Sequence, residues 1–402
     1  MRILLVSEDL PGAQVGGLGK HVVTLGNALL ARGHAVRILG RNDCGPEAPS
    51  RLGFRGPFEP GFDVAHPGWK EKQLGLFNPF KRPYFARKIA AAIARHAGGF
   101  DAVHYHGHLP LVGQYVDPSI NFVQTRHDQG SECLVQLRFR EGEVCTTRAA
   151  RDCAGCIRKD AGPLRESVTA FTVNRYRQAS ARAFAMHKTV FVSDFLRRRF
   201  LRAVPGADLA RCRVIPNVVD YAALREVAAG AAAPNAGEAA LVGRIDTGKG
   251  FGEFLAAAQG RLPPHALLAI GGDGPERPAL EAHFAGRQVR FLGWQDYPAA
   301  LAVMARSHLC VVPSVCEEAC STTVLEALAL GKPCLALARG GTPELASYQH
   351  YPGQLQLFDT MPQLVERMSL LLAQPIRTSP LPSRFGADVA VILARLVDLY
   401  AE

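Results

Sequence analysis

Short apolar runs alternate with amphipathic stretches along most of the chain. Residues 3–7 are typical of a buried strand, and residues 21–32, after a glycine-containing loop at 11–19, repeat apolar side chains at helical spacing. Gly33 is suited to end that helix, and residues 35–39 are typical of a second strand. A strand, a loop, a helix and a strand in this order predict a parallel β–α–β unit.

The same alternation continues in two cycles. The first cycle has further strands at 101–105, 121–125 and 189–192, with helices at 86–96 and 167–185. The second has strands at 239–242, 266–271, 289–292, 309–312 and 333–337, with helices at 251–259, 278–284, 297–307 and 322–330. Strands that alternate with helices predict parallel sheets covered on both faces. We therefore expect two doubly wound α/β domains and a final amphipathic helix at 387–399.

The first cycle ends and the second begins near residues 205–213, so we expect a domain boundary there. We predict an N-terminal domain over residues 1–208 and a C-terminal domain over residues 209–402, each long enough to bury its own core. Residues 228–237 are rich in Ala, Gly and Pro, and we expect them to form a surface loop inside the second domain.

Composition and charge narrow the class of protein. The chain is 48% hydrophobic and 20% charged, as in soluble globular proteins, and it lacks a run of about 18 apolar residues that would span a membrane. Its start resembles a strand more than a signal peptide, so we expect a cytoplasmic protein. The net charge of +10 fits nucleic acid, a membrane surface or small anionic ligands. Because the basic residues are dispersed and no nucleic-acid motif accompanies them, small anionic ligands are favoured.

One denser basic stretch covers residues 69–72 and 81–88. Together with Trp69, Phe77, Phe80 and Tyr84 it admits two interpretations, peripheral contact with the inner face of a membrane or a solvated loop. The sequence leaves the oligomeric state open.

Residues 313–328 combine two glutamates with the start of a helix. Glu318 precedes the helix, which begins near Thr322, and Glu326 lies inside it. The first amides of a helix bind anions, and carboxylates accept hydrogen bonds from the vicinal hydroxyls of sugars and ribose. The alternative is one glutamate that caps the helix and one that is solvated.

Two glycine-containing loops follow strands in the second domain. Arg244 and Lys249 in residues 243–250 place a planar fork and a point charge in one loop, which suits a diphosphate. The spacing of a Walker A loop is absent, and an exposed surface turn is the alternative. Gly272 and Asp273 follow the next strand, in either a ligand-binding loop or a tight turn.

The first domain offers a glycine loop and several histidines. Gly16 and Gly17 follow the first strand, where glycine lets the backbone approach a phosphate, although Gly-x-Gly-x-x-Gly is incomplete. His127 ends a strand, at the edge of the sheet where such folds bind ligands. His104, His106 and His108 alternate as metal ligands can, but no carboxylate partner is evident, which favours core histidines.

Taken together and in order, these residues resemble the retaining glycosyltransferases of family 4, which have the GT-B fold of two Rossmann-like domains facing across a cleft. The resemblance covers nearly the whole chain. It rests on Gly16-Gly17, Thr125-x-His127-Asp128, Val192-Ser193, Ile215-Pro216-Asn217, Gly243-Arg244 with Lys249-Gly250, Gly272-Asp273-Gly274-Pro275, Glu318-x7-Glu326 and Gly340-Gly341-Thr342-Pro343-Glu344. It also implies that the C-terminal helix crosses back to the first domain.

The resemblance implies a role for each site residue. The donor would be a nucleotide-sugar, most often a UDP- or GDP-sugar, and the acceptor a glycan, a lipid-linked sugar or a natural product. Arg244 and Lys249 would hold the donor diphosphate and stabilise the leaving group, with the amide of Gly17 opposite. Glu318 would bind the sugar hydroxyls, and Glu326 would bind the ribose hydroxyls. The amides of Ser321, Thr322 and Thr323 would bind phosphate and sugar. His127 would lie beside the reacting sugar.

Some features depart from the family pattern. Ala319-Cys320-Ser321 stands between the glutamates where Gly-Phe-Gly is usual, and Val218 replaces the glycine that usually follows the asparagine. No Asp-x-Asp motif is present, so a divalent metal at the diphosphate is not expected. Two alternatives to a transferase are a GT-B-like sugar-nucleotide epimerase or phosphorylase, and a nucleotide-binding scaffold without catalysis.

Four of the ten cysteines cluster in a basic insertion at residues 129–160. Cys133, Cys145, Cys153 and Cys156 have the spacing C-x11-C-x7-C-x2-C, which suits a structural, tetrahedral zinc site. A disulfide pair and free thiols are the alternatives. The other six cysteines are scattered, as expected for small buried apolar side chains.

Overall fold

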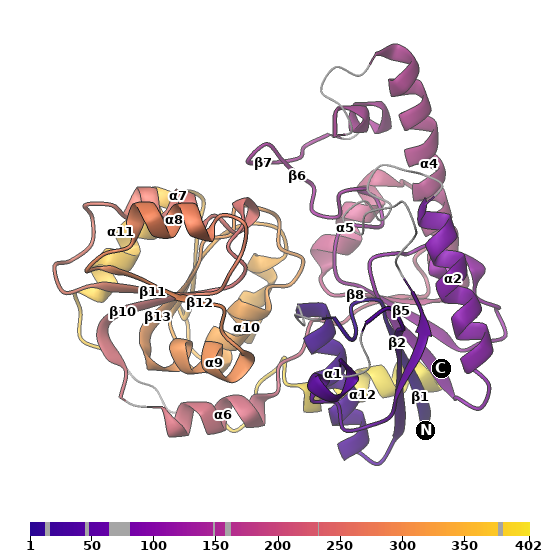
Figure 1. The fold of residues 1–402 in the computed structure, drawn as a ribbon, viewed down its shortest axis with the longest axis horizontal. Helices are drawn as coiled ribbons and strands as arrows, with labels where there is room; N and C mark the ends of the chain where they lie inside the picture. The colour runs from indigo at the N-terminus through magenta and orange to yellow at the C-terminus, as the bar shows by residue number, and fades with distance from the viewer. Residues whose placement is uncertain are drawn as a thin grey trace. The chain divides into compact units, whose positions relative to one another are not determined.

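The computed structural model describes residues 1–12, 17–44, 48–63, 81–147, 149–156, 162–231, 233–376 and 381–402 (Figure 1). The chain divides into two compact units, each with its own parallel sheet. Unit 1 comprises Met1–Arg140, Cys145–Val218 and Val389–Glu402, and unit 2 comprises Glu141–Val144 and Val219–Asp388. Gly16, Trp69, Phe77 and Phe80 lie outside the described residues.

Unit 1 is built on a seven-stranded sheet in the order β3-β2-β1-β4-β5-β8-β9. Its strands are β1 (Arg2–Ser7), β2 (Ala35–Arg41), β3 (Phe58–Phe62), β4 (Ala102–His106), β5 (Phe122–Arg126), β8 (Lys188–Phe191) and β9 (Cys212–Val214). Every neighbouring pair is parallel, so all the carboxyl ends meet at one edge of the sheet. The order runs outward in both directions from β1 and β4, which defines a doubly wound sheet.

Successive side chains of β1 point to opposite faces of this sheet and enter two different cores. Ile3 and Leu5 pack with α1 (Gly17–Ala31) and α12 (Val389–Ala401). Leu4 and Val6 pack with α2 (Lys81–His96), α3 (Val112–Tyr115) and α4 (Pro163–Met186). A further helix, α5 (Asp194–Ala203), follows β8. A two-stranded sheet of β6 (Phe139–Arg140) and β7 (Glu143–Val144) and a 3-10 helix at Ala150–Cys156 precede α4.

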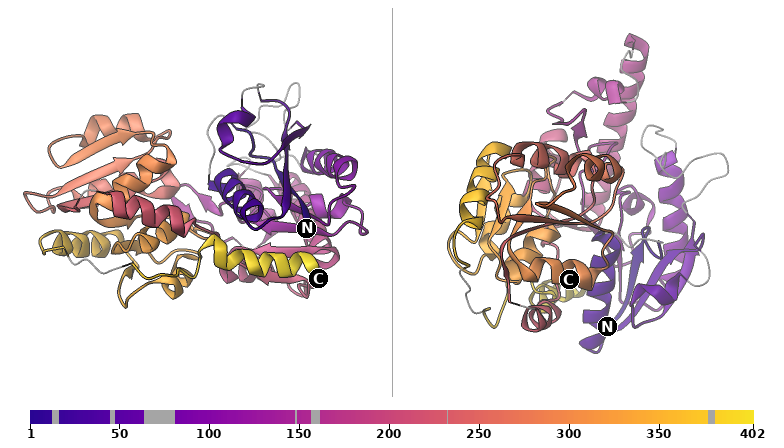
Figure 2. Two further views of the ribbon diagram at one scale, coloured as in Figure 1. Left: turned by 90° about the horizontal axis from the view of Figure 1, so that it is seen from below. Right: turned by 60° about the vertical axis from the view of Figure 1, so that its left-hand side comes forward.

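The helix α12 joins unit 1 although residues 219–388 separate it in sequence from the rest of that unit. Figure 2 shows it in yellow beside the indigo and purple elements. Its buried Tyr400 hydroxyl lies 2.7 Å from His104 Nδ1 in β4, and the Tyr400 carbonyl accepts a hydrogen bond of 2.7 Å from Asn121 Nδ2. The predicted return of the C-terminal helix to the first domain is therefore confirmed.

Unit 2 has a six-stranded parallel sheet in the order β12-β11-β10-β13-β14-β15. Its strands are β10 (Asn235–Val242), β11 (Leu267–Gly271), β12 (Val289–Gly293), β13 (Ser307–Val312), β14 (Cys334–Leu337) and β15 (Leu355–Phe358). Its helices are α6 (Tyr221–Gly230), α7 (Phe251–Ala258), α8 (Arg277–Phe284), α9 (Tyr297–Arg306), α10 (Thr322–Ala329) and α11 (Met361–Leu372). The order again runs outward in both directions, here from β10 and β13.

The predicted alternation of strands and helices is confirmed in both units, but the strands β9 and β15 and the helices α5, α6 and α11 were not predicted. Three further differences have local causes. The helix α1 begins at Gly17, four residues before the predicted start, because Gly17 and Gly19 weaken the helical signal of its first turn. The loop predicted at 228–237 is wrong: α6 continues to Gly230 and β10 already begins at Asn235. The edge strand β3 was not predicted, because Pro60 and Gly61 within it are poor strand formers.

Within the described ranges, no helix combines the length and the apolar character needed to cross a bilayer.

The contact between Tyr400 and His104 predicts a measurable loss of stability. Tyr400→Phe leaves the buried His104 Nδ1 without its partner, so we expect the free energy of unfolding to fall by about 1–3 kcal/mol in urea titrations. Tyr115→Phe is the control, because its ring packs against Arg87 and its hydroxyl makes no hydrogen bond to any described residue. We expect a change within about 0.5 kcal/mol. Equal effects of the two substitutions would contradict the prediction.

Candidate active site

The sheet of unit 2 reverses its winding direction between β10 and β13. Loops that leave neighbouring strands at such a point diverge, and they leave a crevice at the carboxyl ends where α/β folds bind ligands. The loop after β10 carries Arg244 and Lys249, and the loop after β13 carries Glu318. The residues predicted to hold a donor are thus brought to the place in this unit where such folds form binding sites.

An ion pair joins these two loops. Lys249 Nζ lies 2.6 Å from Glu318 Oε1, and the same oxygen accepts a hydrogen bond of 2.7 Å from Ser314 Oγ. Burial opposes both charges, but the pairing outweighs it, so that the pKa of Lys249 is raised and the pKa of Glu318 is lowered. Because both bonds end on Oε1, Oε2 of Glu318 has no hydrogen-bond partner among the described residues and can accept from a ligand hydroxyl.

Asp246 arranges the two cations of the loop after β10. Its Oδ2 accepts a hydrogen bond of 2.7 Å from Arg244 Nε, and its Oδ1 accepts one of 3.2 Å from the amide of Lys249. The Arg244 side chain is 71% exposed, and its terminal nitrogens have no acceptor among the described residues. The guanidinium is therefore oriented by one edge and presents the other, as a ligand for phosphate requires.

Glycines allow the loops of this edge to touch backbone to backbone. At Gly250 (φ +69°) a Cβ would lie 2.2 Å from the carbonyl oxygen of Pro313, and at Gly272 (φ +150°) it would lie 1.9 Å from that of Gly243. Asp273 belongs to the same packing, because its carbonyl accepts a hydrogen bond of 2.9 Å from the amide of Ile245. Gly272 and Asp273 thus support the loop that carries Arg244 and Lys249.

The helix α10 contributes Glu326 and an N-terminus without a side-chain cap. Ser321 occupies the N-cap position, but its hydroxyl makes no capping hydrogen bond to the amides of the first turn, which begins with Thr322 and Thr323. Glu326 is 6% exposed and accepts a hydrogen bond from the hydroxyl of Tyr297, the first residue of α9; burial and this carboxylate raise the Tyr297 pKa. Sequence reasoning missed Tyr297, which lies on a different helix.

Unit 1 gathers polar side chains at the carboxyl ends of β1, β4 and β5. Its sheet reverses direction between β1 and β4, so this edge is a second crevice of the same kind. Glu8 and Asp9 follow β1, His108 follows β4 and His127 follows β5. The first residue of α1 is Gly17, where a Cβ would meet nothing within 4 Å, so the approach to that helix N-terminus is open at this position.

Both ring nitrogens of His127 have partners within unit 1. Nδ1 lies 3.1 Å from Asn217 Oδ1, and Nε2 lies 3.1 Å from His106 Nδ1. Burial, followed by the neighbouring His21, holds the pKa of His127 well below its usual range, so the ring is neutral at neutral pH. Since the Asn217 oxygen only accepts, Nδ1 carries the proton and Nε2 accepts from His106. Asn217 and His106 therefore set both the tautomer and the orientation of His127.

The alternating histidines of β4 separate into three environments. His104 bonds to Tyr400 and to Thr125, whereas His106 joins His21 and His127 in a group whose ligand nitrogens lie within 4.8 Å of one another. His106 Nε2 and His21 Nδ1 are buried without a hydrogen-bond partner. The hydrogen bond between His106 and His127 engages Nδ1 of His106 and Nε2 of His127.

His108 has the opposite charge state from His127. Its Nδ1 bonds to Asp128, its Nε2 lies 3.6 Å from Asp9 Oδ1, and its amide donates to Glu8. Burial opposes the charge, but Asp128 outweighs it and raises the His108 pKa well above its usual range. The expectation that these histidines lack carboxylate partners is therefore wrong, because the acids follow β1 and β5, which flank β4 in the sheet.

The four clustered cysteines line one small cavity of about 30 Å³. The amides of Val135 and Arg138 donate to the sulfur of Cys133, whose pKa burial raises to about 11, and the thiol of Cys153 interacts with those of Cys145 and Cys156. All ten cysteines lie in the described part of the chain, and none forms a disulfide. The predicted insertion therefore does bring the four thiols around one point.

Comparison with known proteins identifies the class. The family model described as Glycosyltransferase Family 4 matches residues 15–223, more than half of the chain, and the model described as Glycosyl transferases group 1 matches residues 237–374. The fold and the site therefore define a glycosyltransferase. The chain belongs to glycosyltransferase family 4, which confirms the predicted family and enzyme class.

Individual relatives agree with this assignment. The glycogen synthase of Mycobacterium tuberculosis is 27% identical over 371 residues, which cover 86% of this chain and 80% of the relative. Anabaena HepE in complex with UDP and glucose has a TM-score of 0.63 and 17% identity over 100% of both chains. Sucrose-phosphate synthase from Thermosynechococcus elongatus has a TM-score of 0.61 and 19% identity, covering 100% of this chain and 98% of that one. The structural likenesses confirm the predicted fold class.

The buried histidines predict that unit 1 loses stability in acid. His21, His104, His106 and His127 all have lowered pKa values, to about 4 for His21 and about 3 for His104, with burial as the largest cause. The unfolded chain takes up these protons near pH 6.5, whereas the folded chain does not, so stability falls as pH decreases from about 6.5 toward 4. Each histidine contributes up to about 1.4 kcal/mol per pH unit.

Comparison with His21→Gln isolates one of these contributions. Urea titrations across this pH range are expected to show a shallower pH dependence in the variant, since glutamine takes up no proton. The comparison cancels the contribution of buried carboxyls such as Glu132, whose pKa burial raises to about 8 and which acts in the opposite direction. Identical pH slopes in the two proteins would mean that His21 does not titrate in this way.

Proposed function

We propose that this protein transfers a sugar from a nucleotide-diphosphate-sugar, a UDP-sugar first and a GDP-sugar second, to an acceptor hydroxyl, with retention of the anomeric configuration. The observation that carries the proposal is the ion pair of Lys249 and Glu318 at the crevice between β10 and β13, with Arg244 in the same loop. Lys249 is suited to bind phosphate, and Glu318 is suited to accept hydrogen bonds from hydroxyl groups.

Unit 2 is assigned to the donor. Lys249 stays protonated beside Glu318 and, with the exposed edge of Arg244, binds the diphosphate. Oε2 of Glu318 accepts from the donor-sugar hydroxyls, and Glu326, oriented by Tyr297, accepts from the ribose hydroxyls. The amides of Ser321, Thr322 and Thr323 bind phosphate and sugar at the start of α10.

The proposed reaction needs positive charge at the leaving group. The bond between the anomeric carbon and the β-phosphate oxygen breaks, and the acceptor oxygen forms a bond to that carbon on the same face. The acceptor proton passes to the departing phosphate oxygen. Arg244 and Lys249 stabilise the charge that develops on the diphosphate, which is the role that a divalent ion has in other transferases.

Unit 1 is assigned to the acceptor and to the surroundings of the reacting sugar. A neutral His127, held by Asn217 and His106, presents a polar ring without a charge that would compete with the cations at the diphosphate. Gly16 and Gly17 are proposed to let the start of α1 approach the donor phosphate. Glycan, lipid-linked and natural-product acceptors all fit this assignment, as does a cytoplasmic location with peripheral membrane contact. The predicted division at residues 208 and 209 falls before β9, whereas unit 1 extends to Val218 and also takes in Val389–Glu402.

Two relatives suggest which donors to test first. One is named glycogen synthase, and the complexes of Anabaena HepE contain UDP, glucose or UDP-glucose. UDP-glucose is therefore the first donor, followed by GDP-, ADP- and dTDP-sugars.

A donor screen combined with one charge substitution tests the proposal. A bound donor should raise the melting temperature by mass action, and the same donor should support transfer. Arg244→Gln removes a cation that is exposed in the structure, so the fold should persist while kcat/KM falls by about 100-fold. Arg290→Gln on β12, which loses the same charge at another exposed position of unit 2, should keep kcat/KM within about twofold of the unaltered protein.

The products distinguish the alternatives. Formation of a glycoside of the retained configuration supports the proposal, whereas interconversion of nucleotide-sugars or release of a sugar phosphate indicates an epimerase or a phosphorylase. Donor binding without turnover indicates a scaffold.

We further propose a structural zinc ion in unit 1, held by Cys133, Cys145, Cys153 and Cys156. Four thiols around one cavity form a suitable ligand set, and the amides that bond to Cys133 stabilise its thiolate. The spacing is wider than in a zinc tetrahedron, where Zn–S bonds of about 2.3 Å place the sulfurs about 3.8 Å apart. Within the described residues, only the histidine group brings three ligand atoms within 4.8 Å, so the thiols must draw together on binding.

Metal analysis tests the zinc proposal. Protein purified without chelator should contain about one zinc per chain, and a chelator should lower its melting temperature. Replacing Cys153 and Cys156 with Ala should abolish both effects, whereas Cys212→Ala, outside the cluster, should preserve them. A zinc-free protein whose melting is insensitive to the chelator would rule out this site.

A further inference from the structure

A large cavity lies within unit 1, and none of its described lining residues belongs to the candidate site of unit 2. Its volume is about 900 Å³, within the usual range of small-molecule sites, and its walls come from α2, α3, α4 and Leu134. Five cations line it, namely Arg82, Arg87, Lys88, Arg175 and Arg182. None of the described lining residues is Asp or Glu, so the described part of the wall carries positive charge.

Three of these cations are not neutralised elsewhere. Arg87, Arg175 and Arg182 are exposed and form no ion pair with any described carboxylate. Lys88, by contrast, pairs with Asp63 at 2.6 Å, and Arg82 is buried, where its guanidinium donates to Leu134 O and to Tyr176 Oη, each at 2.6 Å. Uncompensated guanidinium groups around a concave surface favour an anionic ligand.

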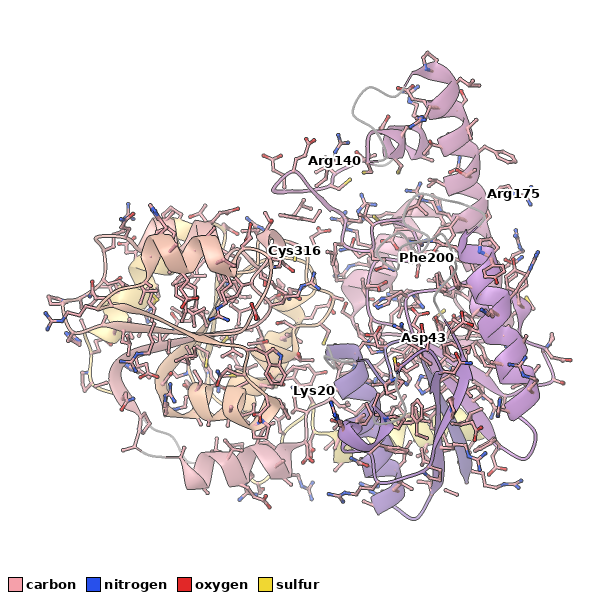
Figure 3. All side chains as sticks on the ribbon, viewed as in Figure 1. Lys20, Asp43, Arg140, Arg175, Phe200 and Cys316 are labelled. Atoms are coloured by element: carbon pink, nitrogen blue, oxygen red, sulfur yellow. The ribbon has the colours of Figure 1, made fainter. Side chains whose placement is uncertain are left out.

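Aromatic rings hold the cations in place. Arg87 lies 5.0 Å from the ring centroid of Tyr115, and Arg175, which projects from α4 in Figure 3, lies 5.5 Å from that of Phe171. Lys88 has the same relation to Tyr84. A guanidinium stacked by its face keeps the N–H groups of its edge available, so these contacts pre-organise donors without using them.

An apolar stripe on α4 leads to this cavity. Leu164, Val168 and Phe171 are 81%, 55% and 62% exposed, and their spacing of four and three residues places them on one face of the helix. Phe171 itself lines the cavity. A ligand with a charged group in the cavity can therefore lay an apolar chain along the helix.

We propose that this cavity binds a phosphate ester attached to an apolar chain. The edges of Arg87 and Arg175 donate to the phosphate oxygens, Arg182 adds charge, and Phe171 with the stripe on α4 contacts the chain. A soluble alkyl phosphate and a lipid headgroup share this chemistry. The proposal does not depend on the transferase function, because none of these residues belongs to the donor site.

The test uses the full chain and two probes. Octyl phosphate, below the concentration at which it forms micelles, is titrated calorimetrically with saturating UDP present to occupy the proposed donor site. Co-flotation with vesicles of phosphatidylcholine and phosphatidylglycerol measures recognition of a headgroup in a membrane. The double variant Arg87→Gln/Arg175→Gln is compared with Arg151→Gln/Arg165→Gln, which removes the same charge from exposed positions of unit 1 outside the cavity.

The expected result is binding of at least one probe, weakened about tenfold or more by the cavity variant and about twofold or less by the control. Phe171→Ala should weaken the same probe. If octyl phosphate binds, a soluble phosphate ester is a sufficient ligand. If only the vesicles bind, the ligand is a lipid headgroup in a membrane. The proposal is overturned if neither probe binds, or if the control loses as much affinity as the cavity variant. UDP binding is measured separately and should be unchanged in the cavity variant. A failure of the cavity proposal can therefore be distinguished from a failure of the proposed donor site.

Discussion

The proposed donor site depends on one ion pair, between Lys249 and Glu318. Each of these side chains lies where burial opposes its charge, and each keeps that charge because the other is 2.6 Å away. The pair can form because the loops after β10 and β13 are in backbone contact at Gly250, where a side chain would not fit. Asp246 then places Arg244 in the same loop, and the winding of the sheet supplies the crevice. The arrangement is present without a ligand, as electrostatic preorganisation requires.

The N-terminal unit uses its sheet edge in a different way. His108 and His127 follow neighbouring strands, yet their environments drive them to opposite protonation states. Three acidic side chains surround His108, whereas the neighbours of His127 among the described residues include His21, His106 and the amide of Asn217. One edge therefore offers a protonated imidazole with carboxylates around it beside a neutral imidazole, and the role proposed for His127 falls on the neutral group.

The sequence predicted the two parallel α/β sheets and many of their helices, because these elements are encoded by local signals. The candidate site residues also follow strands, and their roles stay a prediction. Apolar periodicity marks buried strands, and Glu318, Lys249 and His127 follow such strands directly. Partners that come from distant elements carry no local signal. Tyr297 beside Glu326, Asn217 beside His127, and Asp9 beside His108 meet their neighbours only after the strands are ordered in the sheet. The predicted loop at 228–237 is too long for a related reason. Alanine favours a helix, so α6 continues to Gly230. Asn235 pairs with Ser307 of β13, a distant residue, so β10 already begins there.

The position of α12 has a consequence for how the chain folds during its synthesis. Residues 219–388 complete unit 2 before residues 389–402 have been made. Until then, Val22, Leu25 and Leu29 of α1 lack the apolar cover that Ile392, Leu393 and Leu396 later provide. The nascent N-terminal unit must therefore persist with one face of its core open to water or to a chaperone, while unit 2 can already be folded.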